Sequence, residues 1–104
     1  MIKIMGKGFH LKFDNGLILS VQIGWGNYCE NRDRIYFKCI YELYQSSMEK
    51  PIESKDCEIA IFNDEGEWLT NEVLEIGTND DYVKGYVEIN ELVDIINKCN
   101  NFKI

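Results

Sequence analysis

The stretch FHLKFDNGLILSVQI, residues 9–23, decides the fold of this 104-residue chain. Residues 9–13 alternate apolar and polar side chains, which is the period of a half-buried strand. Asn15-Gly16 follows, and Asn-Gly between two such runs indicates a hairpin, because both central residues of a type I′ turn need a positive φ. Residues 17–23 then return as a second strand. Its apolar face consists of Leu17, Leu19, Val21 and Ile23.

Further extended segments follow the hairpin. Residues 57–62 read as a strand, residues 63–66 supply turn residues, and residues 67–70 return as its partner. Residues 73–76 are predicted to form another short strand, and residues 82–87 a further extended piece.

The middle of the chain is harder to interpret. Residues 29–34 and 46–56 read as a loop and a connection. Residues 35–45 fit both periods: alternate positions suit a strand, whereas Tyr36, Ile40 and Leu43 fit helical spacing. Aromatic enrichment favours the strand.

The clearest element is a helix at the C-terminal end. One face carries Leu92, Val93, Ile95, Ile96 and Cys99. Its first turn fits either a cap at Asn90 or an earlier start at Glu88. A helix of about 11 residues is marginal alone in water, so it must pack on the sheet. We therefore predict a single α+β domain, residues 1–104: an antiparallel sheet of about five or six strands with one C-terminal helix.

Charge is distributed unevenly along the chain. The formal net charge is −7, but residues 1–50 hold seven bases and five acids, whereas residues 51–104 hold four bases and 13 acids. This balance argues against a general nucleic-acid or anionic-membrane binder. The sequence has no apolar run of 18 residues, and its charged start does not resemble a signal peptide, so we expect a cytoplasmic protein.

Catalytic and metal-binding patterns are missing from the sequence. The single histidine, His10, has no Ser or Cys at a recognisable motif distance, and alternation places it on the solvent face. The four cysteines form no Cys-x-x-Cys pair and are expected to be free thiols: Cys29, Cys39, Cys57 and Cys99. We therefore predict a protein that is not an enzyme and holds no cofactor or metal.

Two segments are candidate binding surfaces. The loop of residues 24–34 offers aromatic rings for stacking, amides for reading a base edge and arginines for a phosphate: Trp25, Asn27, Tyr28, Asn31, Arg32 and Arg34. The other interpretation is that its aromatic residues close the core while its arginines are solvated. The acidic half offers carboxylates to a basic partner, or is merely a solvated face: Asp64, Glu65, Glu67, Glu72, Glu75, Asp80 and Asp81.

The pattern NG-x3-SVQ-x-G-x-GNYC-x-NR, residues 15–32, resembles the N-terminal motif of a family of small phage and prophage proteins. Residues 58–68 and 83–92 are similar to its second half in spacing, although the aromatic stretch of residues 35–44 is longer and Ser-Pro is missing before the helix. The resemblance implies a phage context but no reaction.

Two functional hypotheses follow from these observations. The leading one is a phage-encoded counter-defence protein, of the kind that includes anti-CRISPR proteins, which inhibits a host defence protein through the acidic surface. The alternative is a sponge that sequesters a nucleotide signal in the loop of residues 24–34, and for it we expect a homo-oligomer.

Overall fold

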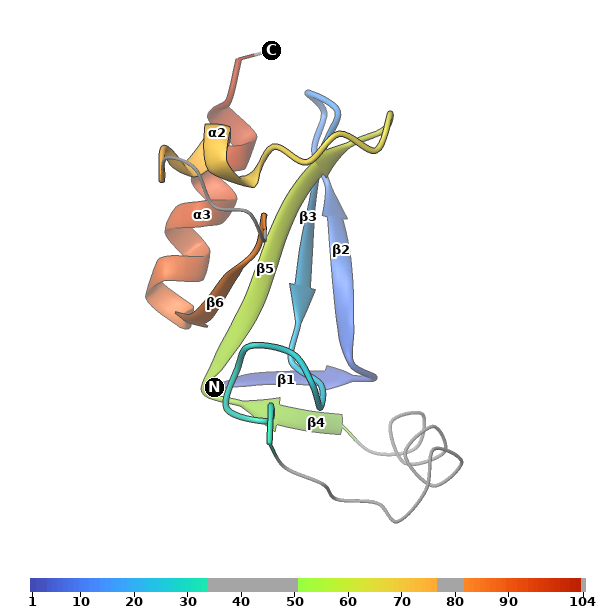
Figure 1. The fold of residues 1–104 in the computed structure, drawn as a ribbon, viewed down its shortest axis with the longest axis vertical. Helices are drawn as coiled ribbons and strands as arrows, with labels where there is room; N and C mark the ends of the chain where they lie inside the picture. The colour runs from blue at the N-terminus through green and yellow to red at the C-terminus, as the bar shows by residue number, and fades with distance from the viewer. Residues whose placement is uncertain (34–50, 77–81, 104) are drawn as a thin grey trace.

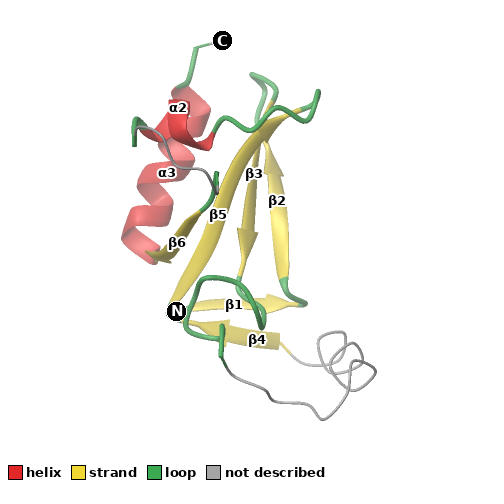
Figure 2. Ribbon diagram, viewed as in Figure 1, coloured by secondary structure: helices red, strands yellow, loops and turns green. Residues whose placement is uncertain are grey.

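The computed structural model describes residues 1–33, 51–76 and 82–103, and they form an α+β arrangement (Figure 1 and Figure 2). The elements, labelled as in Figure 1, are β1 (Ile2–Met5), β2 (Gly8–Lys12), β3 (Leu17–Gln22), β4 (Pro51–Ser54), β5 (Asp56–Asn63), α2 (Thr70–Leu74), β6 (Lys84–Glu88) and α3 (Ile89–Asn101). The predicted segment of residues 35–45 lies outside the described residues.

The described strands form two antiparallel sheets. The larger has the order β2-β3-β5-β6, and the smaller pairs β1 with β4. The predicted fold class is therefore confirmed, but its strands are divided between two sheets. Strand β1 was not predicted, and the prediction of a connection at residues 51–54 is wrong, because they form β4. Both strands have four residues and carry charged side chains, and β4 begins at Pro51, so neither gives a strong pattern.

The hairpin of β2 and β3 forms as predicted, but its turn is of another kind. Phe13 N donates to Leu17 O at 2.8 Å and Gly16 N to Phe13 O at 3.0 Å, so the loop has three residues. Gly16 alone in this loop has a positive φ, 90°. Asn15 instead uses its side chain: Nδ2 donates to the carbonyls of Cys99 and Phe102 at the end of α3. The turn thus fastens the hairpin to the helix.

One face of the larger sheet is packed against α3. The fully buried residues of this layer are Leu17, Leu19, Val21, Ile23, Cys57, Ile59, Ile61 and Val87. From α3 come Leu92, Ile95 and Cys99, spaced one turn or two apart as predicted. The prediction for Val93 is wrong, because its side chain is half exposed. The helix has Glu88 as its N-cap residue, so it begins at the earlier of the two starts considered.

The predicted strand at residues 73–76 is wrong, because residues 70–74 form the short helix α2. The hydrophobic pattern of the four residues 73–76 is too short to distinguish a strand from one turn of a helix. The deciding contacts are tertiary: Thr70 Oγ1 accepts a hydrogen bond from Ile61 N at 2.9 Å and donates to Tyr82 O at 2.7 Å. Val73 and Leu74 then reach the core from a helix. The return segment before α2 is reduced to a single bridge between Phe62 and Trp68.

Candidate functional site

The second face of the larger sheet carries no helix in the described part of the chain. Residues that alternate with the buried ones point to this open face, and the register aligns them in rows across the strands. One row joins His10, Ser20 and Ala60, and the next joins Lys12, Ile18 and Phe62. The small residues Ser20 and Ala60 are buried between larger neighbours, so they form the floor of this face.

Aromatic rings gather at one end of the open face. The rings of His10 and Phe62 meet edge to face with centroids 5.5 Å apart, and Phe62 packs on Trp68 at 5.8 Å. We call His10, Phe62 and Trp68 the aromatic row. Trp68 is 50% exposed, so a large apolar surface is offered to a partner. As predicted, His10 lies on the solvent side, and no buried carboxylate or nucleophile pairs with it among the described residues.

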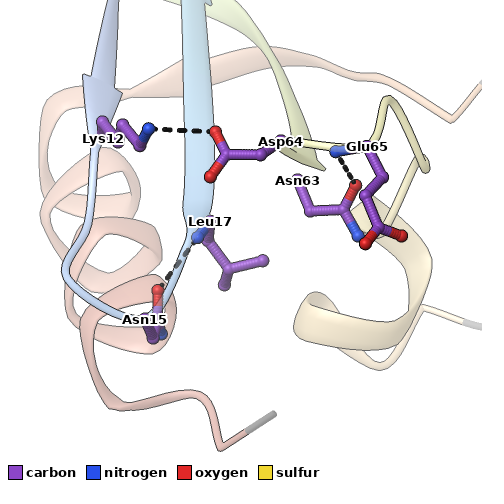
Figure 3. A network of polar contacts seen from close by, with 6 residues as sticks. All are labelled: Lys12, Asn15, Leu17, Asn63, Asp64 and Glu65. Atoms are coloured by element: carbon purple, nitrogen blue, oxygen red, sulfur yellow. Dashed lines mark hydrogen bonds and ion pairs between the residues drawn. The ribbon is translucent and has the colours of Figure 1, made fainter.

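An acidic turn held by backbone hydrogen bonds to Asn63 borders the aromatic row. The Oδ1 atom of Asn63 accepts hydrogen bonds from the backbone N–H groups of Glu65 and Glu67, both at 3.0 Å, while Gly66 at φ 81° closes the turn. The carboxylate of Asp64 lies 3.0 Å from Lys12 Nζ on β2 (Figure 3). The acidic turn has three exposed carboxylate residues, Asp64, Glu65 and Glu67. Asn63 Nδ2 also donates to Glu67 Oε1 at 3.3 Å.

The predicted acidic surface is divided by the fold. Glu72 and Glu75 are exposed on and just after α2, which packs beside α3 rather than on the open face. Asp80 and Asp81 lie outside the described residues. The structure therefore places Asp64, Glu65 and Glu67 beside the aromatic row and puts Glu72 and Glu75 on the helical side.

The loop of residues 24–33 lies at the other end of the open face, over β5 and β6, and it is fixed by carboxylates. Glu58 Oε2 accepts from Tyr28 N at 2.8 Å, and its Oε1 accepts from Asn27 Nδ2 at 3.4 Å. Asp56 Oδ1 accepts from Glu30 N at 2.6 Å. These charge-assisted hydrogen bonds hold the loop against β5.

Most of the polar side chains that were predicted to read a ligand serve the loop itself. Asn31 is 1% exposed, and its Nδ2 donates to Ile23 O at 2.8 Å and Glu53 O at 3.0 Å, which links the two sheets. Asn27 Oδ1 accepts from Gly24 N. Both amide side chains are therefore engaged within the fold.

Three of the predicted loop residues remain accessible. Trp25 is 49% exposed, Tyr28 is 37% exposed, and the Arg32 guanidinium lies 4.9 Å from the centroid of the Tyr28 ring. Tyr28 packs on Gly85 of β6, where an added Cβ would come within 2.5 Å of Tyr28 Cβ. Arg34 lies outside the described residues.

The described cysteines are buried free thiols, as predicted: Cys29, Cys57 and Cys99. Burial raises the pKa of Cys57 to about 12 and the pKa of Cys99 to about 11. It also raises the pKa of Cys29, against hydrogen bonds from Asn31 and Ser54 that lower it. Protonated thiols are poor nucleophiles and poor metal ligands, so these three serve packing. Within residues 1–33, 51–76 and 82–103, no group of three metal-ligating side chains forms.

None of the residues of the aromatic row is among the predicted binding residues. Phe62 alternates with Ile59 and Ile61 and so belongs to the outer face, and the predicted return of residues 67–70 beside residues 57–62 is present as the bridge between Phe62 and Trp68. The exposure of these rings depends on where the helices pack, which no local pattern records. None of the described helices is long and apolar enough to cross a membrane. Comparison with family models, curated proteins and solved structures found no match to this chain.

Proposed function

We propose that this chain is a non-enzymatic binding protein, encoded by a phage, that inhibits a bacterial defence protein in the host cytoplasm. The observation that carries the binding role is the half-exposed Trp68, which packs on Phe62 beside the acidic turn. Large exposed aromatic residues surrounded by charged groups are typical of protein interfaces. The phage context rests on the resemblance of residues 15–32 stated above.

The carboxylates of the acidic turn favour a partner with a basic surface. Asp64, Glu65 and Glu67 are exposed on a backbone fixed by Asn63, so they can accept charged hydrogen bonds without ordering a flexible loop. Charges at the rim of an interface raise association rates and weaken with salt. Trp68 would supply the apolar anchor and the turn would steer the encounter.

The test is binding to a panel of purified bacterial defence complexes at low and high salt. Trp68→Ala should weaken binding by roughly thirtyfold, as expected for an interface anchor worth about 2 kcal/mol. The double variant Glu65→Gln/Glu67→Gln should slow association and reduce the salt dependence. The matched control, Glu72→Gln/Glu75→Gln, removes the same charge on the helical side and should bind as the wild type does.

Inhibition is measured by phage plating on cells that carry the recognised defence system. Expression of the wild-type protein should restore plating, and Trp68→Ala should not. Absence of binding to the whole panel, or equal loss of binding in both double variants, would contradict the proposal.

A nucleotide sponge is the second candidate, favoured by the Arg32 guanidinium over the Tyr28 ring and by the exposed Trp25 in the same loop. The Glu58 carboxylate beneath the loop opposes an anionic ligand, and the amides of Asn27 and Asn31 are engaged elsewhere. A true ligand at 100 times its Kd should stabilise the protein by about 2.7 kcal/mol. Thermal-shift screening of cyclic nucleotides and ADP-ribose derivatives, with Arg32→Ala as the control, decides this alternative.

A further inference from the structure

Strand β2 is an edge strand of the larger sheet among the described residues. It is the first strand of the order β2-β3-β5-β6, so it pairs with β3 on one side and no described element pairs with the other. Ile23 N donates to Lys7 O and Phe13 N donates to Leu17 O, so the odd-numbered residues bond to β3. Because backbone groups alternate along an antiparallel strand, Gly8, His10 and Lys12 turn their N–H and C=O groups outward.

The opposite edge of the sheet is protected against strand pairing, and this contrast sets β2 apart. Strand β6 is broken by a bulge opposite Cys57 and Ile59, and Tyr86 has a positive φ of 55°. The Tyr86 N–H donates to Tyr28 O of the loop that lies over this edge. Bulges, prolines, covering loops and outward charges are the usual means by which proteins block their sheet edges. Strand β2 has no bulge, no proline and no positive φ.

The one charged side chain of β2, that of Lys12, points away from the unpaired edge of the strand and toward β5. Lys12 Nζ lies 3.0 Å from Asp64 Oδ1, which comes from the turn after β5, two strands further into the sheet. Figure 3 shows the two side chains meeting across the strands. The ammonium group is therefore held over the open face, and its charge is partly compensated there.

We propose that β2 pairs antiparallel with β2 of a second copy of this chain, about a two-fold axis at His10. The register that pairs all five residues, Gly8–Lys12, is centred on His10. In this register Lys12 faces Gly8 of the second copy, so the charged residue meets one without a side chain. The two sheets of four strands become one continuous sheet of eight.

The side chains of β2 are self-complementary in this register. Phe9 lies opposite Leu11 of the second copy on the helical side, and both are now partly exposed. Apolar cross-strand pairs stabilise a sheet, and these would bury each other across the axis. Three hydrogen-bonded pairs satisfy the outward groups of Gly8, His10 and Lys12. Because the strand is short, we expect a dimer whose population rises with protein concentration. This inference does not depend on the proposed function.

Disulfide trapping tests the register directly. The variant is His10→Cys in a chain that also carries Cys39→Ser, because the other three native cysteines are buried. In the proposed register its two thiols lie opposite each other at a hydrogen-bonded pair. The Cα atoms of such a pair are about 5.5 Å apart, a distance that suits a disulfide. The matched control, Lys12→Cys, puts the two thiols four residues apart along the strands, about 13 Å, which a disulfide cannot span. With a mild oxidant, the His10→Cys protein should give a covalent dimer on a non-reducing gel, and Lys12→Cys should not. Cross-linking of both variants alike, or of neither, overturns the proposal.

Sedimentation of the unmodified chain provides the second readout. The average mass of the wild type should rise from monomer toward dimer with concentration. His10→Pro removes a backbone donor that faces outward, so it should stay monomeric while keeping its circular dichroism spectrum. Leu11→Pro removes a donor that bonds to β3 and should unfold the chain. A wild type that remains monomeric at every concentration overturns the proposal, and so does a folded His10→Pro protein that still dimerises.

Discussion

The loop of residues 24–33 and the turn of residues 63–67 use the same residue types in opposite ways. In the loop, carboxylates from the neighbouring strand β5 hold the backbone: Glu58 binds Tyr28 N and Asp56 binds Glu30 N. In the turn, the amide of Asn63 holds the backbone and the carboxylates are left exposed. A count of acidic residues therefore does not reveal which carboxylates can meet a partner.

The two ends of the open face differ accordingly. At the loop end, Glu58 and Asn27 are hydrogen-bonded to each other, and Asn31 of the loop is buried. At the turn end, Asn63 bonds within the turn, Asp64 makes an exposed ion pair with Lys12, and Trp68 is exposed beside them. The turn end therefore fits the proposed binding role better, because its carboxylates remain exposed to solvent.

The largest difference should appear between two asparagine variants. Asn31→Ala removes the donor to the buried carbonyl of Ile23 and the partly buried carbonyl of Glu53, so the free energy of unfolding should fall by about 2–4 kcal/mol. Asn63→Ala loses hydrogen bonds that water can replace, and should cost about 1 kcal/mol or less. Urea unfolding of both variants measures the two values, and similar losses would refute the distinction between loop and turn.

A matched pair of glutamate variants tests the same contrast with charged groups. Glu58→Ala removes the acceptor for Tyr28 N and Asn27 Nδ2 and should cost about 1–3 kcal/mol. Glu65→Ala, in the turn, should change stability by less than about 0.5 kcal/mol because its side chain is exposed. The same unfolding experiment compares them, and an equal cost at the two positions would show that Glu58 does not hold the loop.

The smallest expected effect is at the ion pair across the sheet. Lys12 and Asp64 are both more than half exposed, so Asp64→Asn should alter the free energy of unfolding by less than about 0.5 kcal/mol. The difference in the free energy of unfolding between Asp64→Asn and the wild type should also be the same at low and high salt. A large, salt-dependent loss would mean that the acidic turn supports the fold, which would weaken its assignment to binding.

Much of the fold could be predicted because its signals are local. Alternation over residues 9–23 defined the hairpin, and the spacing of Leu92, Ile95 and Cys99 defined the helix. The failures have tertiary causes. Strand β1 is stabilised by pairing with β4, which follows it by almost fifty residues, and α2 depends on the contact between Thr70 and Ile61. Neither contact leaves a local pattern.

The candidate site was predicted in part for the same reason. The loop of residues 24–34 and the acidic turn were identified as candidate surfaces from their composition. The sequence left open whether Trp25 and Tyr28 close the core, and the structure shows both exposed. The division of the acidic residues between two sides of the molecule does not follow from composition, because it depends on where α2 packs. The pairing of Phe62 with Trp68 agrees with the predicted return of residues 67–70, whereas the contact of Phe62 with His10 joins β5 to β2 across the sheet and has no local pattern.

The sequence by itself determined the α+β class, the hairpin, the C-terminal helix and the lack of a catalytic motif. These features depend on residue types and hydrophobic spacing over short stretches of the chain. The tertiary structure decided which polar groups are free. Glu58 and Glu65 are the same residue type on the same half of the chain, yet one is bound by a backbone N–H from thirty residues earlier and the other faces water. That difference arises from hydrogen bonds between segments far apart in the chain, whose geometry no local pattern records.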